Sequence, residues 1–178
     1  MEALIYGAGK LGREVLRILI AENSVEIIGF LDDDRSDSGS GVERFRVIGN
    51  SSDLSRYRSF GVEGICVAAE SGEERLRIAG LAEKAGYYLL TVKSDSSFIS
   101  PDAHPGRGCI FLENSRVENG AVIQHCSLIG KGVEIGSSSC IPAGSNIVKT
   151  VISRQKIGAG KPGKNSDQQT DITRGGVD

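Results

Sequence analysis

The sequence predicts two units in tandem: an α/β unit built on a small parallel sheet and, after it, a parallel β-helix. Three observations lead to this prediction. Strand-like and helix-like segments alternate through the first 93 residues, as they do in α/β domains. A Gly7-x-Gly9-x-x-Gly12 motif lies between the first strand and the first helix. Through residues 99–157 apolar side chains return at every sixth position, a period that neither an α-helix nor an ordinary strand produces.

The first unit begins with a short apolar run at residues 3–6, typical of a buried strand. After Gly12, a helical face is formed by Leu11, Val15, Ile18 and Leu19. The remaining elements are expected as strands at 25–31, 65–69 and 88–92, an edge element at 47–49, a helical turn at 53–54, a helix at 73–84 and a linker at 93–97. The helix at 73–84 should bury Leu76, Ala79, Leu81 and Ala82 and end at Gly86.

The glycine motif has the surroundings of a nucleotide-binding turn of the Rossmann-like type. It opens a helix, and the next strand ends in Asp32, Asp33 and Asp34, about 20 residues beyond the last glycine. Glycines allow a tight turn and a close approach, and the helix N-terminus offers N–H groups to a phosphate. The candidate nucleotide-binding residues are therefore Gly7, Gly9, Gly12, Asp32 and Asp33. Two alternatives are a plain turn without a ligand and an NAD-dependent redox protein, which NADH binding would test.

Two residue series, each with a period of six, define the β-helix. The first is mostly Ile, Val or Phe and should point into the shaft: Ile99, Pro105, Phe111, Val117, Ile123, Ile129, Ile135, Ile141, Ile147 and Ser153. The second, four residues later, is small or β-branched and should lie where the wall turns: Ala103, Cys109, Ser115, Ala121, Ser127, Val133, Ser139, Ser145, Val151 and Ile157. Corners with unusual backbone angles are expected at Gly106, Gly108, Gly130, Gly132 and Gly136.

Composition restricts the partners of the protein. The 21 Lys and Arg nearly balance the 23 Asp and Glu, so nothing in the charge favours nucleic acid or an anionic membrane. Without a long apolar run or a signal peptide, we expect a cytoplasmic protein that does not insert into membranes. The four scattered cysteines form no Cys-x-x-Cys pair, which predicts free thiols and no metal site.

The repeats resemble the left-handed β-helix of the hexapeptide acyltransferases. That family closes its helix with Gly-x-Pro-Ala-Lys beside the adenine of coenzyme A, and here Gly160, Pro162 and Lys164 match, with Gly163 in place of Ala. Together with the glycine motif, the chain resembles the bacterial sugar acetyltransferases of surface-glycan synthesis. These include sialic acid O-acetyltransferases and UDP-4-amino-sugar N-acetyltransferases. The resemblance covers residues 3–164 and is carried by residues 5–9, 12–14, 28–33, 85–87 and 123–130.

The resemblance implies an acetyltransferase that uses acetyl-CoA and acts on a UDP-linked amino sugar or a related sugar. Residues 1–95 would hold the nucleotide sugar, with Asp32 and Asp33 near the base. Residues 96–164 would form the acyltransferase β-helix, shortened relative to the family, and residues 165–178 lack apolar periodicity and are expected to be a disordered tail. The resemblance further implies a homotrimer with coenzyme A between neighbouring shafts, bound by Gly144, Gly160, Pro162 and Lys164.

His125 is the candidate general base. It follows the inward-facing Ile123 by two positions and should project outward, and the family carries its base here in a Glu/Gln-His-Asp/Glu motif. Neutral imidazole can take the proton of an amine that attacks a thioester near pH 7, and a backbone N–H would stabilise the oxyanion. The sequence departs from the motif because Cys126 stands in place of the acid. A surface histidine without a role is the alternative for His125, and His104 is expected to be structural.

A second function fits the same sequence. Only one or two rungs separate His125 from the closing pattern, and each full turn of such a helix climbs about 4.8 Å. Losing a turn would bring the adenine end of coenzyme A closer to His125. The alternative is therefore a non-catalytic relative that binds a sugar nucleotide or serves as a scaffold and has no affinity for coenzyme A.

Overall fold

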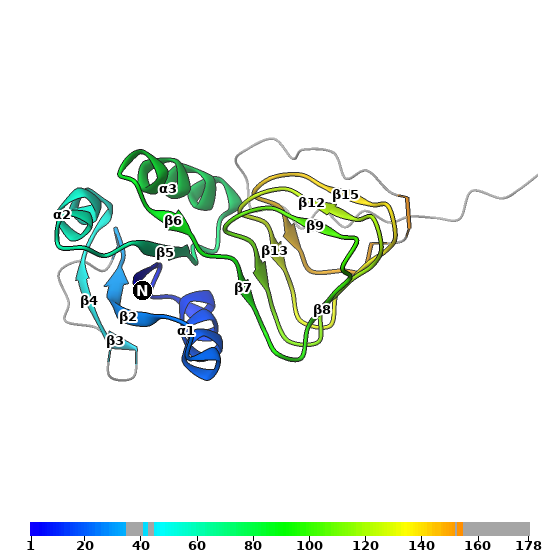
Figure 1. Cartoon of the computed structure of the whole chain (residues 1–178), viewed down its shortest axis with the longest axis horizontal. Coiled ribbons are helices and arrows are strands. Elements are labelled where there is room, and N and C mark those ends of the chain that lie inside the picture. The colour runs from blue at the N-terminus through cyan, green and yellow to red at the C-terminus, as the bar shows by residue number, and fades with distance from the viewer. Residues whose placement is uncertain (35–40, 43–44, 152, 155–178) are drawn as a thin grey trace, which may run out of the picture.

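The computed structural model of the chain, shown in Figure 1, describes residues 1–34, 41–42, 45–151 and 153–154. It contains an α/β unit and, beside it, a left-handed β-helix that is seen in Figure 1 as a triangular shaft. Both parts of the predicted fold class are confirmed. None of the helices in the described part of the chain is long and apolar enough to span a membrane.

The α/β unit is built on a six-stranded sheet in the order β3-β4-β2-β1-β5-β6. All pairings are parallel except that of β3 with β4. Helix α1 (Lys10–Glu22) covers one face, and α2 (Leu54–Ser59) and α3 (Gly72–Lys84) cover the other (Figure 1). The remaining elements are β1 (Glu2–Tyr6), β2 (Glu26–Leu31), β3 (Gly41–Val42), β4 (Phe45–Gly49), the 3₁₀ turn η1 (Ser51–Asp53), β5 (Gly64–Val67) and β6 (Tyr88–Leu89).

Helix α3 differs from the prediction on its buried face. That face carries Arg75, Ile78, Ala79 and Ala82, whereas Leu81 is 39% exposed. The predicted burial of Leu81 is therefore wrong, because the buried face runs along Arg75, Ile78 and Ala82 and leaves Leu81 beside it. The predicted end is confirmed: Gly86 has φ +88°, and Gly86 N and Tyr87 N donate to Glu83 O and Ala82 O at 3.0 Å each.

Within the described residues, the β-helix has ten two-residue strands in three parallel walls, which give three complete coils and part of a fourth. The first wall is β7 (Val92–Lys93), β10 (Ile110–Phe111), β13 (Leu128–Ile129) and β16 (Asn146–Ile147). The second is β8 (Phe98–Ile99), β11 (Arg116–Val117) and β14 (Glu134–Ile135), extended by a bridge from Ile135 to Val151. The third is β9 (His104–Pro105), β12 (Val122–Ile123) and β15 (Cys140–Ile141).

The predicted inward series fills the shaft. From Phe111 to Ile147 every member is buried, and together they form one continuous apolar cluster. The ends of the series differ from the prediction, since Ile99 is only half-buried and Pro105 and Ser153 are exposed. Ile99 and Pro105 lie in the first coil, which has a neighbouring coil on one side only. Ile157 lies outside the described residues.

The corners repeat with the same period of six. A left-handed backbone recurs at Gly108, Asn114, Gly120, Cys126, Gly132, Ser138 and Gly144, with φ between 56° and 69°. Of the five glycines predicted to have unusual angles, only Gly108 and Gly132 do. Gly130 instead allows two coils to lie close together, since a Cβ there would lie 3.0 Å from Ile147 O on the next coil.

The predictions of one strand at 88–92 and of a linker at 93–97 are wrong, because the structure divides these residues differently. Tyr88 and Leu89 belong to the α/β sheet as β6, whereas Val92 and Lys93 form β7 and pair with β10 in the first wall. A continuous apolar run thus crosses from one sheet to another. The β-helix therefore begins at Val92, a few residues before the boundary expected at residue 96.

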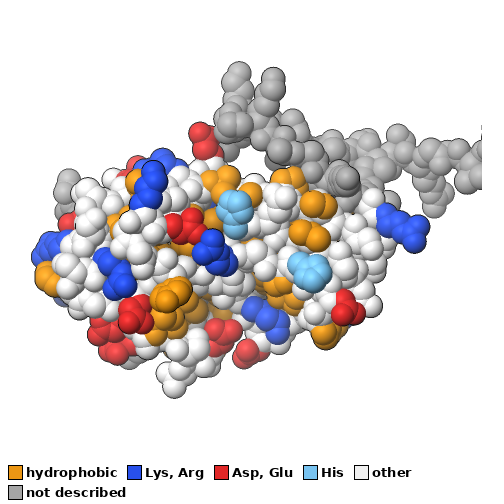
Figure 2. All heavy atoms as spheres, turned by 45° about the horizontal axis from the view of Figure 1, so that its top comes forward, with side chains coloured by type: hydrophobic (Ala, Val, Ile, Leu, Met, Phe, Trp, Pro, Cys, Tyr) orange, Lys and Arg blue, Asp and Glu red, His pale blue; other side chains and the backbone are white. Residues whose placement is uncertain are grey.

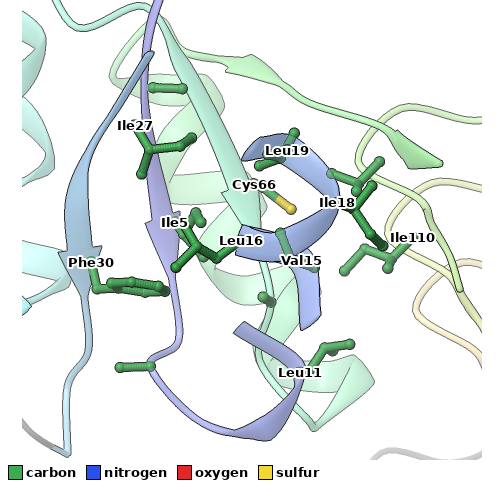
Figure 3. Packing of buried hydrophobic residues seen from close by; sticks show 14 of the residues in the cluster. Ile5, Leu11, Val15, Leu16, Ile18, Leu19, Ile27, Phe30, Cys66 and Ile110 are labelled. Carbon is green, nitrogen blue, oxygen red and sulfur yellow. The ribbon is translucent and has the colours of Figure 1, made fainter. Parts of the chain in front are cut away.

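Helix α1 packs between the sheet and the first wall. Outward-facing Val92, Ile110 and Leu128 of this wall belong to the same apolar cluster as Val15 and Ile18 of α1. Figure 3 shows Ile110 beside Ile18 and, on the other side of the helix, Leu16 toward Ile5 and Phe30 of the sheet. Lys131 adds an ionic contact between the units, with its Nζ 3.2 Å from Glu14 Oε1. The two units therefore share one core.

The shaft core makes a testable prediction about stability. Ile129 has no exposed surface, so Ile129→Ala should lower the free energy of unfolding by about 2–5 kcal/mol, from lost burial and the cavity left behind. Urea denaturation measures this loss. The control is Val148→Ala, since Val148 is 74% exposed and its truncation should change stability by no more than about 0.5 kcal/mol. Equal losses in the two variants would contradict the inward orientation of the series.

Candidate functional site

The glycine turn between β1 and α1 is built from its own glycines. Gly7 has φ +98°, and its N–H donates to Leu31 O at 2.8 Å. A Cβ on Gly12 would lie 1.9 Å from Gly7 O, so the first turn of α1 can rest on this turn only without a side chain there. Gly9 is the N-cap of α1 and has more room, with Glu70 Oε1 the nearest atom to a Cβ at 3.8 Å. Gly7 and Gly12 thus shape the turn, and Gly9 leaves space above it.

Two carboxylates already occupy the N–H groups of this turn. Ala8 N–H donates to Asp32 Oδ2 at 2.8 Å, and Leu11 N–H donates to Glu70 Oε1 at 3.1 Å. The other oxygen of Asp32 accepts the N–H of Asp34 at 3.0 Å. The expectation that the N-terminus of α1 offers free N–H groups to a phosphate is therefore wrong for Ala8 and Leu11. Carboxylate oxygens of Asp32 and Glu70 lie at these two positions instead.

Asp33 lies in a polar cluster at the carboxyl edge of the sheet, formed by Tyr6, Asp33, Ser51, Glu74 and Arg77. Its carboxylate accepts Ser51 N–H at 2.7 Å and Ser51 Oγ–H at 3.0 Å, and pairs with Arg77 Nη2 at 2.9 Å. Tyr6 OH donates to Glu74 Oε1 at 2.9 Å. Ligands of open α/β sheets bind at this edge, so the carboxyl-edge cluster lies where a nucleotide is expected.

The cluster shifts the ionisation of two of its members. Burial alone would raise the pKa of Asp33, but the hydrogen bonds from Ser51 and Arg77 outweigh it and hold that pKa below the ordinary value. Burial and the hydrogen bonds to Glu74 and Asp33 raise the pKa of Tyr6. At neutral pH the cluster therefore contains ionised Asp33 paired with Arg77, and a neutral Tyr6.

His125 lies at the corner that leads from β12 in the third wall to β13 in the first wall. Its side chain is exposed, as predicted, and the imidazole makes no hydrogen bond within the described part of the chain. Figure 2 shows the two histidines of the chain on one face, with hydrophobic side chains near both. The backbone is held by neighbouring coils: Gly144 N–H donates to His125 O at 3.0 Å, and a Cβ on Gly106 would lie 2.6 Å from His125 N.

Cys126 has a structural place in the same corner. Both His125 and Cys126 follow β12, and Cys126 takes the left-handed backbone of the corner. Its side chain is buried in the cluster beneath α3, where burial, followed by the nearby Cys109, raises the pKa of the thiol to about 11. A buried neutral thiol neither orients the imidazole nor serves as a nucleophile. The cysteines of the described residues are free, as predicted.

Arg75 is the residue that the sequence did not reveal. Its side chain comes from the buried face of α3 and has no exposed surface. The guanidinium donates to Cys126 O at 2.9 Å and to Gly144 O and Ser145 O at 3.2 Å each, and it also contacts Asn146 Oδ1. The only sequence signal is its place on the face of Ile78, Ala79 and Ala82. This arginine joins α3 to two corners of the β-helix.

The loop after β5 brings the glycine turn and the His125 corner together. The side chain of Glu70 accepts from Leu11 of the turn, while its backbone oxygen accepts from Asn146 Nδ2 at 2.9 Å. A Cβ on Gly72 would lie 1.8 Å from Gly144 O, so only glycine allows α3 to begin this close to the shaft. The loop after β5 thus contacts both the glycine turn and the coil next to His125.

The residues predicted for coenzyme A are only partly described. Gly144 lies beside His125 and against Gly72 and Leu76 of α3. Gly160, Pro162 and Lys164 lie outside the described residues, as does the predicted tail at 165–178. No group of three or more His, Cys, Asp or Glu side chains could hold a metal ion within the ranges that the structure describes.

The first unit matches a known family in sequence, and most of the chain is similar in structure to solved proteins. Residues 2–80 match the PglD N-terminal domain family. The structure is similar to a mutant of perosamine N-acetyltransferase from Caulobacter crescentus, which was solved in complex with CoA and GDP-perosamine. The two share 20% sequence identity with a TM-score of 0.70, and the match covers 81% of this chain and 72% of that chain. It is also similar to the acetyltransferase domain of PglB from Neisseria gonorrhoeae FA1090, solved with acetyl coenzyme A, at 25% identity and a TM-score of 0.72, covering 80% and 68%. No curated protein matches in sequence. The predicted resemblance to the sugar acetyltransferases is confirmed.

The Asp33–Arg77 pair predicts a pH-dependent stability. Because the pKa of Asp33 is lowered in the fold, its contribution is present above the ordinary Asp value of about 3.9 and is lost as the pH falls through the lower folded-state pKa. Asp33→Asn should therefore lower the melting temperature at pH 7, and the gap to the parent should narrow below about pH 4. The effect should be modest, since the Arg77 side chain is half exposed.

Thermal unfolding between pH 3 and pH 7 measures this gap, with Asp95→Asn, at an exposed position, as the control. A gap that widens toward low pH would contradict the stabilising role of the ionised carboxylate.

Proposed function

We propose that this chain, whose residues 2–80 match the PglD N-terminal domain family, is an acetyl-CoA-dependent acetyltransferase that acts on a nucleotide-activated amino sugar. The observation that supports this most is the junction at the loop after β5. There the glycine turn, through Glu70, and the His125 corner, through Asn146 and Gly144, meet the same few residues. An acceptor held by the α/β unit would lie beside a candidate base on the shaft.

His125 would act as the general base. Its imidazole is exposed and has no hydrogen-bond partner among the described side chains, so it is accessible to an amine. As the sugar amino nitrogen forms a bond to the thioester carbonyl carbon, His125 would take its proton. A backbone N–H would stabilise the oxyanion, and the C–S bond would then break, with the proton passing to the departing sulfur of coenzyme A. Transfer to a sugar hydroxyl would follow the same steps, and the amine is our first choice.

The nucleotide would bind at the carboxyl edge, near Asp32 and Asp33. Carboxylate oxygens accept hydrogen bonds from the ring N–H groups that uracil and guanine both present. The resemblance favours a UDP-linked sugar, whereas the Caulobacter relative was solved with GDP-perosamine. Since Ala8 N–H and Leu11 N–H are occupied, the diphosphate would rely more on cations at this edge, such as Lys10 and Arg77.

We further propose a homotrimer in the cytoplasm, with coenzyme A lying along the outside of the shaft. Helix α1 covers the first wall, whereas residues of the second and third walls, such as Phe98 and Val122, are exposed. A neighbouring shaft and the donor would therefore use those two walls. Gly144, Gly160, Pro162 and Lys164 remain the proposed contacts for coenzyme A.

The two histidines provide a matched test of the base. His125→Ala should lower the turnover of acetyl-CoA with the acceptor sugar by a factor of about 10²–10⁴, while the melting temperature and acetyl-CoA binding stay close to those of the parent. His104→Ala is the control, because His104 is also exposed on the β-helix and is not proposed to take part in the reaction. Free thiol released from coenzyme A measures the rate. Full turnover by His125→Ala would remove this residue from the mechanism.

Ligand binding separates the transferase from the non-catalytic alternative. Acetyl-CoA and a UDP-linked 4-amino sugar should each raise the melting temperature, since a ligand at 100 times its Kd stabilises the native state by about 2.7 kcal/mol. NADH should produce no shift. A GDP-linked sugar, tested beside the UDP-linked one, shows which nucleotide base the site prefers. A scaffold would respond to the nucleotide sugar alone, so the absence of any acetyl-CoA shift would contradict the transferase.

A further inference from the structure

Arg75 carries a buried charge that the chemistry proposed above does not use. Burial lowers its pKa, but arginine stays protonated at any physiological pH. Within the described ranges no carboxylate forms an ion pair with it, and six oxygens accept its N–H groups instead. All N–H groups of this buried guanidinium are hydrogen-bonded to backbone and amide oxygens. The fold must place these oxygens specifically, since any missing partner would leave an unpaired buried donor at a cost in stability.

The six acceptors come from both units. Ala69 O at 2.9 Å and Glu70 O at 3.2 Å belong to the loop after β5, next to the glycine turn. The other four belong to two stacked corners of the shaft, at Cys126 and at Gly144 to Asn146. One planar group therefore fixes three backbone segments that are distant in sequence.

These contacts surround the backbone of His125. Arg75 Nε holds the carbonyl of the next residue, Cys126, and Arg75 Nη2 holds the carbonyl of Gly144, whose own N–H donates to His125 O. The same helix reaches the nucleotide edge on its other side, where Glu74 binds Tyr6 and Arg77 binds Asp33. Helix α3 thus connects the carboxyl-edge cluster and the His125 corner through residues 74–77, about one turn of the helix.

We propose that Arg75 is a positioning residue that sets the His125 imidazole relative to the acceptor sugar. It would act through the backbone of the corner and touch neither substrate. The catalytic part of this inference rests on the function proposed above, whereas the link from Arg75 to the His125 side chain does not. Misplacing a catalytic group by about 1 Å can cost a factor of about 100 in rate, so a shift of the corner is enough to matter.

The first experiment measures the imidazole directly. The chain has only two histidines, so ring resonances of histidine-labelled protein can be assigned with His125→Ala and His104→Ala. In Arg75→Ala the His125 resonances should shift or broaden, and those of His104 should stay in place. Asn146→Ala is the milder variant, because it removes one acceptor of Arg75 and the bond to Glu70 O at an exposed position. It should move the same resonances by less, and it carries the test if Arg75→Ala does not fold.

The second experiment measures turnover. For folded Arg75→Ala, kcat should fall by a factor of about 10–100 while the KM for acetyl-CoA stays unchanged. Added guanidinium, well below unfolding concentrations, should restore part of kcat by filling the vacated place. Urea is the matched control, since it is planar and of similar size but uncharged. A merely structural role predicts a lower melting temperature with unchanged kcat per folded molecule and no rescue.

The two experiments separate the two proposals. Unchanged His125 resonances in folded Arg75→Ala, or in Asn146→Ala if that is the variant that folds, would overturn the positioning role whatever the enzyme does. Shifted resonances in a protein without any acetyl transfer would support the link from Arg75 to His125 and contradict the proposed function alone. Shifted resonances with unchanged kcat would overturn the catalytic consequence.

Discussion

The arrangement of the two units depends on one buried guanidinium. Apolar contact between α1 and the first wall is non-directional and would allow the shaft to slide or turn against the sheet. Arg75 removes that freedom, because each of its oxygen partners must lie in the plane and direction of an N–H group. If either unit moved, the Arg75 guanidinium would lose oxygen partners while it stayed buried away from water. A buried charge that loses its partners costs several kcal/mol. The orientation of the units is therefore set by polar contacts and stabilised by apolar ones.

The shaft could be predicted because its information is local. Each inward position tolerates only a large apolar side chain, so Phe111, Ile123 and Ile129 reveal the period directly. The corners were only partly visible: the left-handed backbone recurs at every sixth residue, but Asn114, Cys126 and Ser138 adopt it without being glycine. Asn adopts this conformation more readily than most residues, whereas Cys126 and Ser138 are held in it by neighbouring coils. A search for glycine therefore finds some corners and also finds glycines with another purpose, such as Gly130.

The candidate site was less visible, since its main contacts join residues far apart in the chain. The glycine motif correctly predicted the turn, but not that Asp32 and Glu70, 24 and 59 residues from their partners, would accept its N–H groups. Arg75 shares a helical face with Ile78 and Ala82, yet an arginine in a helix ordinarily indicates the solvent side. Only the tertiary structure supplies the carbonyl groups that make its burial tolerable. A sequence pattern can show on which helical face such a residue lies. Its role depends on hydrogen-bond partners that only the tertiary structure reveals.

Under the proposed function, the place of His125 would allow a short shaft to keep its acceptor site. Its corner joins the exposed third wall to the first wall, which α1 covers, so the imidazole lies at the border between the units. The contacts that fix this corner come from Gly106, Gly144 and α3, and all of them lie within the described coils or the α/β unit. Coils beyond the fourth would extend only the part of the shaft along which a donor lies, by about 4.8 Å each. In the proposed enzyme, a shaft without such coils would hold the far end of the donor at a different place and would keep the geometry between the α/β unit and His125.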